Sequence, residues 1–305
     1  MGMASGDRLT ARVAGLGMGA AIALFPAIAV AAAVDLYYER TVMAVADSRC
    51  RLFTPQMSAA LASAQAQSRG AALRAGVSTD DLAKVESRAR TKAIAEPCGS
   101  DALKTASNRV RDAFAGFSRL QKMNYPGEHS DWMAERLASR SGRVWSLSQN
   151  VPFGTDTLTF GLAGQNGGLE MMAVVQFADQ AQPYAARLVM RDPSRARGPY
   201  LDRRKADARG VLALADRVTP RSATLAFMAD AKLPVDPLLN PTKAKGVIAY
   251  RFPVSAAKAL AALDPREAVE IEFLFAAKSG DIVRRGDIEV GDFAAGRAFL
   301  AAGQR

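Results

Sequence analysis

Histidine and cysteine are almost absent from this 305-residue chain, which contains one His and two Cys. A zinc site takes four ligands, most of them Cys or His, so these three residues cannot supply one. The sequence also lacks a Walker loop and a G-x-S-x-G nucleophile elbow. We therefore expect neither a metal site nor a cofactor, and nothing indicates the enzyme classes that depend on these motifs.

Lysine is scarce beside arginine, because 10 of the 40 basic residues are Lys and the other 30 are Arg. A GC-rich coding bias would produce this excess together with the abundant alanine. The net charge of +10 is therefore weak evidence for a nucleic-acid partner, and we expect none. Apolar residues make up 49% of the chain, which is enough to bury a core and argues against a disordered chain.

Charged residues are also missing between positions 14 and 34, just after two arginines near the amino terminus. This stretch contains nine Ala, three Gly and Pro26, and it ends in small residues at alternating positions. The pattern predicts a signal peptide over residues 1–33, cleaved near Ala31 or Ala33 during export. The alternative is an uncleaved membrane anchor, because 21 uncharged residues are long enough to span a bilayer and to give residues 14–34 a membrane contact.

The two cysteines, Cys50 and Cys98, flank a predicted helical hairpin. In an oxidising compartment two thiols at the base of a hairpin would pair, and neither lies in a C-x-x-C motif. We predict a structural disulfide and a periplasmic or secreted location. The alternative location is the inner membrane, with the bulk of the chain outside the cytosol.

Residues 34–140 are expected to form a helical subdomain that carries the disulfide. Three helices have Ser or Thr caps at their starts, at Thr54, Ser78 and Ser100. The third has the clearest apolar period, with residues spaced by three and four as far as Met123. A short fourth helix is expected over residues 130–138.

From about residue 142 the apolar period changes to two, which is typical of strands. The predicted class is α+β, with an N-terminal helical hairpin or bundle followed, over residues 141–305, by an antiparallel β-sandwich or partly open barrel. We expect strands near residues 158–162, 169–177, 184–190, 210–216, 222–229, 246–252, 269–276 and 281–290, with a short helix over 255–263.

Two weak catalytic candidates come from short patterns. Ser255 and Lys258 form S-x-x-K at the start of a predicted helix, a spacing that would bring the amine toward the hydroxyl. The companion motifs of penicillin-recognising enzymes are missing, so a helix-cap serine and a solvated lysine explain the pattern better. Glu128 and His129 precede Ser130 and would lie in a loop that ends in a helix cap. The other possibility is that they line a pocket between the two domains, together with Asp131 and Glu135.

The strongest local anomaly is a basic segment over residues 187–209, which has five more basic than acidic residues. Arginine side chains suit phosphate and carboxylate groups. A solvated loop is the simpler account, and the binding alternative assigns an anionic ligand to Arg195, Arg197, Arg203, Arg204 and Lys205.

These observations predict an exported cell-envelope protein that binds or scaffolds and is not an enzyme. Its expected partner is an anionic envelope component or another envelope protein. Two alternatives remain: a hydrolase that uses Ser255 and Lys258, and a single-span accessory subunit of a membrane complex.

Overall fold

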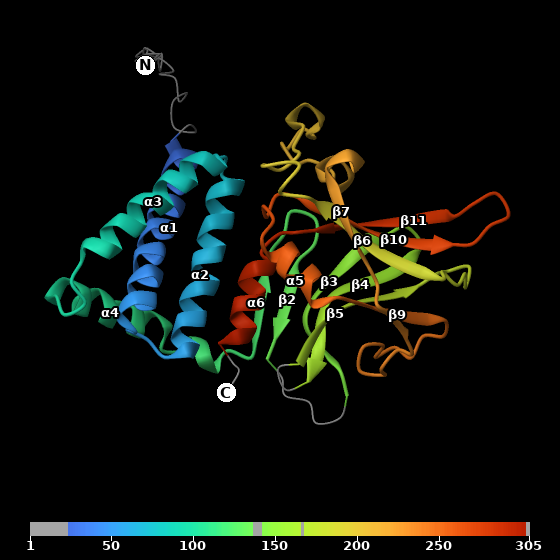
Figure 1. Ribbon diagram of the computed structural model, residues 1–305, viewed down its shortest axis with the longest axis horizontal. Coiled ribbons are helices and arrows are strands. Elements are labelled where there is room, and N and C mark those ends of the chain that lie inside the picture. Colours follow the sequence, from blue (N-terminus) through green and yellow to red (C-terminus); the bar gives the residue numbers. More distant parts are fainter. Residues whose placement is uncertain (1–23, 137–141, 166–167, 303–305) are drawn as a thin grey trace, which may run out of the picture.

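The computed structural model describes residues 24–136, 142–165 and 168–302. The long helices form a layer on one side of the molecule and the β-sheets lie on the other, with the short helices between them (Figure 1). The four helices are α1 (Leu24–Cys50), α2 (Pro55–Arg74), α3 (Thr79–Ala95) and α4 (Asp101–Phe114). The short helices are α5 (Val254–Ala261) and α6 (Phe293–Ala301).

Local capping chemistry sets the starts of α2, α3 and α4. The hydroxyls of Thr54, Ser78 and Ser100 accept the backbone N–H groups of the residues three positions on, at 3.3, 3.0 and 3.2 Å. Each cap satisfies a helix N–H that has no partner within the helix. The three predicted helix starts are therefore confirmed, as is the disulfide between Cys50 and Cys98.

Helix α2 lies between α1 and α6 and joins the two halves of the molecule (Figure 1). Its buried positions are mostly small, with Ala60, Ser63, Ala64 and Gly70 among them. Small side chains allow neighbouring helices to approach closely on both sides. A larger residue would displace the Asp292 side chain, since a Cβ added at Gly70 would lie 2.6 Å from its carboxylate oxygen.

The strands form two antiparallel sheets, so the predicted α+β class is confirmed and the sheets do not close into a barrel. The strand bounds are Lys122–Tyr125 (β1), Trp132–Glu135 (β2), Val144–Phe153 (β3), Asp156–Gln165 (β4), Gly168–Gln176 (β5), Ala185–Arg191 (β6), Thr224–Met228 (β7), Ala231–Leu233 (β8), Val247–Phe252 (β9), Ala268–Phe275 (β10) and Ile282–Glu289 (β11). The larger sheet has the order β1-β2-β3-β4-β5-β9-β8, and the smaller has the order β11-β10-β6-β7.

Aromatic side chains from both sheets fill the space between them. Phe177, directly after β5, packs edge-on against Phe273 of β10 with 5.3 Å between ring centroids. Trp132 packs against Phe160 of β4 and Phe293 of α6. All five side chains are fully or almost fully buried, and each contributes about 1.5–3 kcal/mol through removal from water.

Several local predictions are wrong. The helix expected over residues 130–138 is replaced by β2, because Trp132 and Ala134 are buried on one face while Met133 points to solvent, which is a period of two. The strand expected over 210–216 is a loop followed by the 3-10 turn η3 (Leu214–Arg217). Helix α4 ends at Phe114 rather than continuing to Met123, which lies in β1. Strands β1, β3 and β8 and helix α6 were not predicted.

The amino-terminal prediction falls partly outside the described residues. Helix α1 begins at Leu24 and runs without a break through Ala31 and Ala33. Of the helices in the described part of the chain, none combines the length and the apolar character needed to cross a membrane.

Candidate functional site at the junction of the two halves

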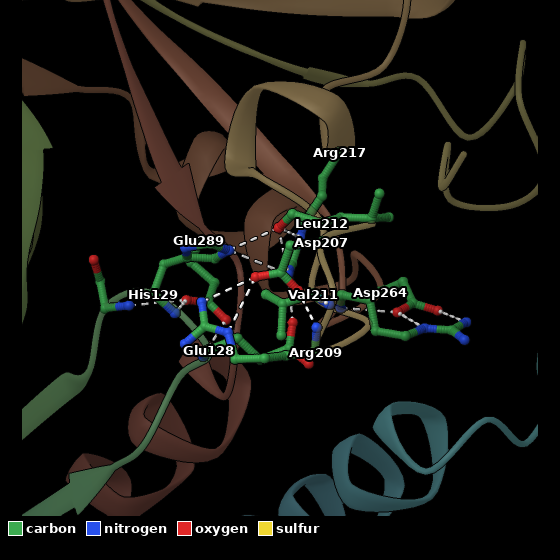
Figure 2. A network of polar contacts seen from close by, with 11 residues as sticks. Glu128, His129, Asp207, Arg209, Val211, Leu212, Arg217, Asp264 and Glu289 are labelled. Atoms are coloured by element: carbon green, nitrogen blue, oxygen red, sulfur yellow. Dashed lines mark hydrogen bonds and ion pairs between the residues drawn. The ribbon is translucent and has the colours of Figure 1, made fainter. Parts of the chain in front are cut away.

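A hairpin loop between β1 and β2 carries Glu128 and His129. The carboxylate of Glu289 binds the backbone of this loop. The side chain of Glu289 accepts the backbone N–H groups of Glu128, His129 and Ser130 at 2.9, 2.9 and 3.0 Å (Figure 2). Glu289 is only 2% exposed. Three consecutive N–H groups around one anion form an anion-binding nest, which here is filled by the protein's own carboxylate.

The side chains of Glu128 and His129 are engaged by the loop that precedes η3. His129 Nε2 lies 2.7 Å from the backbone carbonyl oxygen of Leu212. Nε2 also lies 3.3 Å from a guanidinium nitrogen of Arg217, so the imidazole ring sits between a carbonyl acceptor and a cationic donor. Arg217 donates to the same carbonyl at 2.8 and 3.0 Å and forms an ion pair with Glu128 (Figure 2). The ion pair between Glu128 and Arg217 therefore links the β1–β2 hairpin loop to η3.

The other two acids of the predicted pocket, Asp131 and Glu135, form contacts within the same β1–β2 hairpin. Asp131 accepts the N–H of Gly127 at 3.2 Å and the side-chain amide of Asn124 at 2.9 Å. Glu135 pairs with Lys122 across the β1–β2 ladder at 2.7 Å. The structure has a cleft of about 300 Å³ between the helical layer and the sandwich half, and neither these acids nor His129 lines it.

Ser255 and Lys258 are both exposed on α5. In the described structure no hydrogen bond joins the Ser255 hydroxyl to the Lys258 amine. Ser255 is also not the helix cap expected from the sequence. Pro253 occupies the N-cap position of α5, and no side chain makes a capping hydrogen bond there. The structure thus does not bring the S-x-x-K residues together.

The predicted anion-binding residues lie in an excursion between β6 and β7, and most are paired with acids. Arg195 contacts Asp192 at 3.3 Å, Arg204 contacts Asp202 at 2.9 Å, and Lys205 contacts Asp216 at 2.7 Å. Two of the five predicted residues, Arg197 and Arg203, are exposed and have no side-chain hydrogen bond or ion pair within the described ranges. Pairing therefore reduces the uncompensated charge on this segment.

Two buried ion pairs involve the sandwich half, and one of them joins it to α2. Arg74 of α2 donates two hydrogen bonds of 3.1 Å to Asp292, and Arg191 donates two of 2.8 Å to Glu267. Burial raises the pKa of Asp292 above its ordinary value of 3.8, and the hydrogen bonds from Arg74 oppose this shift. In each ion pair two hydrogen bonds join the guanidinium to the carboxylate, and these bonds compensate for the burial of both charges.

Beside the Arg74–Asp292 pair, the cleft of about 300 Å³ opens between the helical layer and the short helices of the sandwich half. One wall is α2, from Ala62 to Arg69, and the other is the end of α5 with the start of α6. Its lining is mainly small and apolar, with Arg69, Gln65 and Tyr37 as polar members on the helical side. Clefts between structural units are common ligand sites.

Arg69 differs from Arg74, Arg191 and Arg217 because it has no acid partner among the described residues. It is half-buried and makes no hydrogen bond or ion pair among residues 24–136, 142–165 and 168–302. Gln65 is already engaged with Thr41 at 2.9 Å, and the Tyr37 hydroxyl donates to Glu86 at 3.2 Å. Burial is the main cause that raises the pKa of Tyr37, with Glu86 adding to the shift and Arg69 opposing it.

The sequence patterns do not identify Arg69, Asp292 or Glu289 as site residues. A signal was present for the first, since Ala62, Ala66 and Gly70 form a stripe of small residues on α2 that predicts a close neighbour beside Arg69. The two acids carry no such local signal, because their partners lie far away in sequence.

Comparisons with protein-family models, with curated proteins and with solved structures each find no match for this chain. A functional assignment therefore has to come from the residues of the site itself.

Proposed function

We propose that this chain is a binding module that works outside the cytosol and takes an anionic ligand in the cleft between its two halves. The observation that carries the proposal is the unpaired guanidinium of Arg69, half-buried in a cleft with small apolar walls. Every other arginine described above at this junction is matched by a carboxylate. A carboxylate or phosphate group of a ligand would supply the acid partner for Arg69.

The chemistry of the cleft favours such a ligand. A guanidinium donates two parallel hydrogen bonds to a carboxylate or phosphate, and partial burial strengthens them. Asp292, the carboxylate in the cleft lining, is already paired with Arg74, so it does not neutralise Arg69. The cleft also receives the positive end of α6 through Ala294 and Ala295. The apolar walls would cover the rest of a small ligand.

The extracytoplasmic location, and the periplasm or cell envelope in particular, belongs to the same proposal. The disulfide supports it, because such bonds persist in oxidising compartments. The packing of α1 supports a cleaved signal as well. Ala31 and Ala32 are exposed, whereas Ala33 and Val34 begin the packing against the buried Tyr37.

The test uses three anionic probes that represent envelope chemistry: acetyl-D-Ala-D-Ala, glycerol 3-phosphate and inorganic phosphate. We expect at least one to raise the thermal unfolding midpoint in a saturable way, and Arg69→Ala to weaken its binding by at least about 10-fold. Arg88→Ala, which removes an exposed arginine of α3 away from the cleft, is the matched control. No stabilisation by any probe, or an equal response of Arg69→Ala, contradicts the proposal.

The excursion is proposed as a second contact for anionic envelope material, centred on Arg197 and Arg203. The double change Arg197→Glu and Arg203→Glu should weaken binding to phosphatidylglycerol vesicles in a salt-dependent way while leaving the cleft probes unaffected. Changing the paired Arg204→Glu alone should have a smaller effect. Vesicle binding that is unaltered by the double change rules out this contact.

A further inference from the structure

A second hollow lies on the helical half, between α1 and α4, and it is independent of the cleft. It is a groove of about 430 Å³, within the size range of small-molecule sites. Its lining is mainly apolar and includes Tyr38, Met43, Leu61, Val110 and Phe114.

The groove exists because α4 packs closely at one end only. Leu103, in the first turn of α4, is 4% exposed and sits in the cluster with Met43 and Leu61. Val110 and Phe114, two and three turns further along, continue the same apolar stripe but are only half-buried. Among the described residues, the apolar stripe is thus only partly covered along the second half of the helix.

The disulfide lies just before the start of α4, the end of the helix that packs closely. Cys50 is the last residue of α1, and Cys98 lies two positions before the Ser100 cap of α4, with 5.5 Å between the two Cα atoms. The bond therefore holds the start of α4 against the end of α1, and the groove opens away from it. Loss of the bond would allow α4 to shift and would change the width of the groove.

The charges around the groove have one dominant sign. Its lining includes Arg40, Lys92 and Arg109, against the single acid Glu39. Lys92 pairs with Glu96 at 3.2 Å and Arg40 donates to the carbonyl of Ala64 at 2.6 Å. Arg109 is exposed and has no hydrogen bond or ion pair within the described part of the chain. An anionic group at the rim would therefore meet a net positive charge.

We infer that this groove binds a single alkyl chain that carries an anionic head group. The chain would lie along the apolar stripe of α4, and Arg109 would contact the head group. An apolar ligand without charge would leave the basic rim unused, and an inorganic anion would leave the apolar floor exposed to water. The amphiphile satisfies both parts of the groove.

The experiment is a calorimetric titration of the full, disulfide-bonded chain with dodecyl phosphate below its micelle concentration. Dodecyltrimethylammonium and dodecyl maltoside have the same alkyl chain with a cationic and a neutral head, and butyl phosphate has the same head with a short chain. We expect 1:1 binding of dodecyl phosphate and at least about 10-fold weaker binding of the other three. Equal binding of all three dodecyl compounds overturns the inference.

Two pairs of variants locate the site. Arg109→Glu should weaken dodecyl phosphate binding by at least about 10-fold, whereas Arg88→Glu on α3 should not. Ala113→Trp, at an exposed position of the groove, should block binding, whereas Ala102→Trp at an exposed position outside it should not. Binding unchanged by Arg109→Glu or Ala113→Trp overturns the inference even if the variants fold normally.

Two further measurements distinguish the groove from the cleft and from a contact between two copies of the chain. Arg69→Ala should bind dodecyl phosphate as the wild type does, so a failure of the cleft proposal leaves this one standing. Reduction of the disulfide should weaken binding in a chain that still shows its helical circular dichroism. If the chain instead forms dimers that Ala113→Trp disrupts and dodecyl phosphate does not, a second copy occupies the groove and the inference is wrong.

Discussion

The buried carboxylate of Glu289 accepts a 2.9 Å hydrogen bond from the backbone N–H of His129, a residue 160 positions earlier in the sequence. Through this bond and its two neighbours, the last strand of the smaller sheet fixes a hairpin of the larger one (Figure 2). The backbone of Glu289 adds to the link, since its N–H donates to the side chain of Gln149 at 3.0 Å.

Glu289→Gln is expected to destabilise the protein by about 2–4 kcal/mol. Glutamine keeps one acceptor oxygen, but its NH₂ group would face backbone N–H donors and leave them unpaired while buried. The measurement is the free energy of unfolding in urea. Glu39→Gln, at an exposed position, serves as the control and should change stability by less than about 0.5 kcal/mol. Equal stability of the two variants would show that the nest contributes little.

The difference between local and distant signals explains which features the sequence predicts. The caps at Thr54, Ser78 and Ser100 depend on residues three positions away, so a short window contains all the information. The partners of Glu289 and Arg69 depend on the tertiary arrangement, which no window of the sequence contains. The turn-rich sequence around Trp132 fits a helix cap as well as a strand, and the pairing of β2 with β1 and β3 determines that it is a strand.

Acid should weaken the smaller sheet through Glu272 of β10, which receives hydrogen bonds from Arg285, Arg187 and Arg221. Burial alone would raise the pKa of Glu272, but these bonds outweigh it and lower the pKa below its ordinary value of 4.5. A lowered pKa in the folded state gives stability that is present above pH 4.5 and is lost as the pH falls through the lowered value.

Glu272→Gln should therefore be less stable than the wild type at pH 7, and the gap should narrow as the pH falls below about 4.5. The measurement is the unfolding free energy across this range, with Glu39→Gln as the control that shows no such narrowing. A gap that stays constant with pH would mean that Glu272 does not titrate differently in the folded and unfolded chains.

Gly161 on β4 has no room for a side chain. A Cβ atom at this position would lie 1.9 Å from the backbone carbonyl oxygen of Leu147, beside the irregular register of β3. Gly161→Ala should cost at least about 2 kcal/mol in unfolding free energy, because backbone must move to relieve the clash. Gly116→Ala meets nothing within 4 Å and should be neutral or slightly stabilising. Thermal or urea unfolding of the two variants gives the comparison.

Removal of the disulfide should loosen the helical half. The bond closes a loop with a sequence separation of 48, so the chain-entropy model gives about 4 kcal/mol of stabilisation. The double variant Cys50→Ser and Cys98→Ser should lose stability by about this amount in urea. Hydrogen exchange should show the loss first in α4, which the bond ties to α1. A loss spread evenly over both halves would instead indicate that the protein unfolds as one unit.

Export predicts that the mature chain is shorter than the translated one. Cleavage near Ala31 or Ala33 would lower the intact mass by about 3 kDa, which mass spectrometry of protein from its native source measures directly. The truncated chain should also keep its stability, because Ala31 and Ala32 are exposed and Tyr37 is the first buried side chain of α1 from residue 30 onward, where burial is described. A chain that begins at Val34 should therefore unfold within about 1 kcal/mol of the full chain. A full-length mass in native protein, together with a large loss of stability on truncation, would instead make the first turns of α1 a permanent part of the fold.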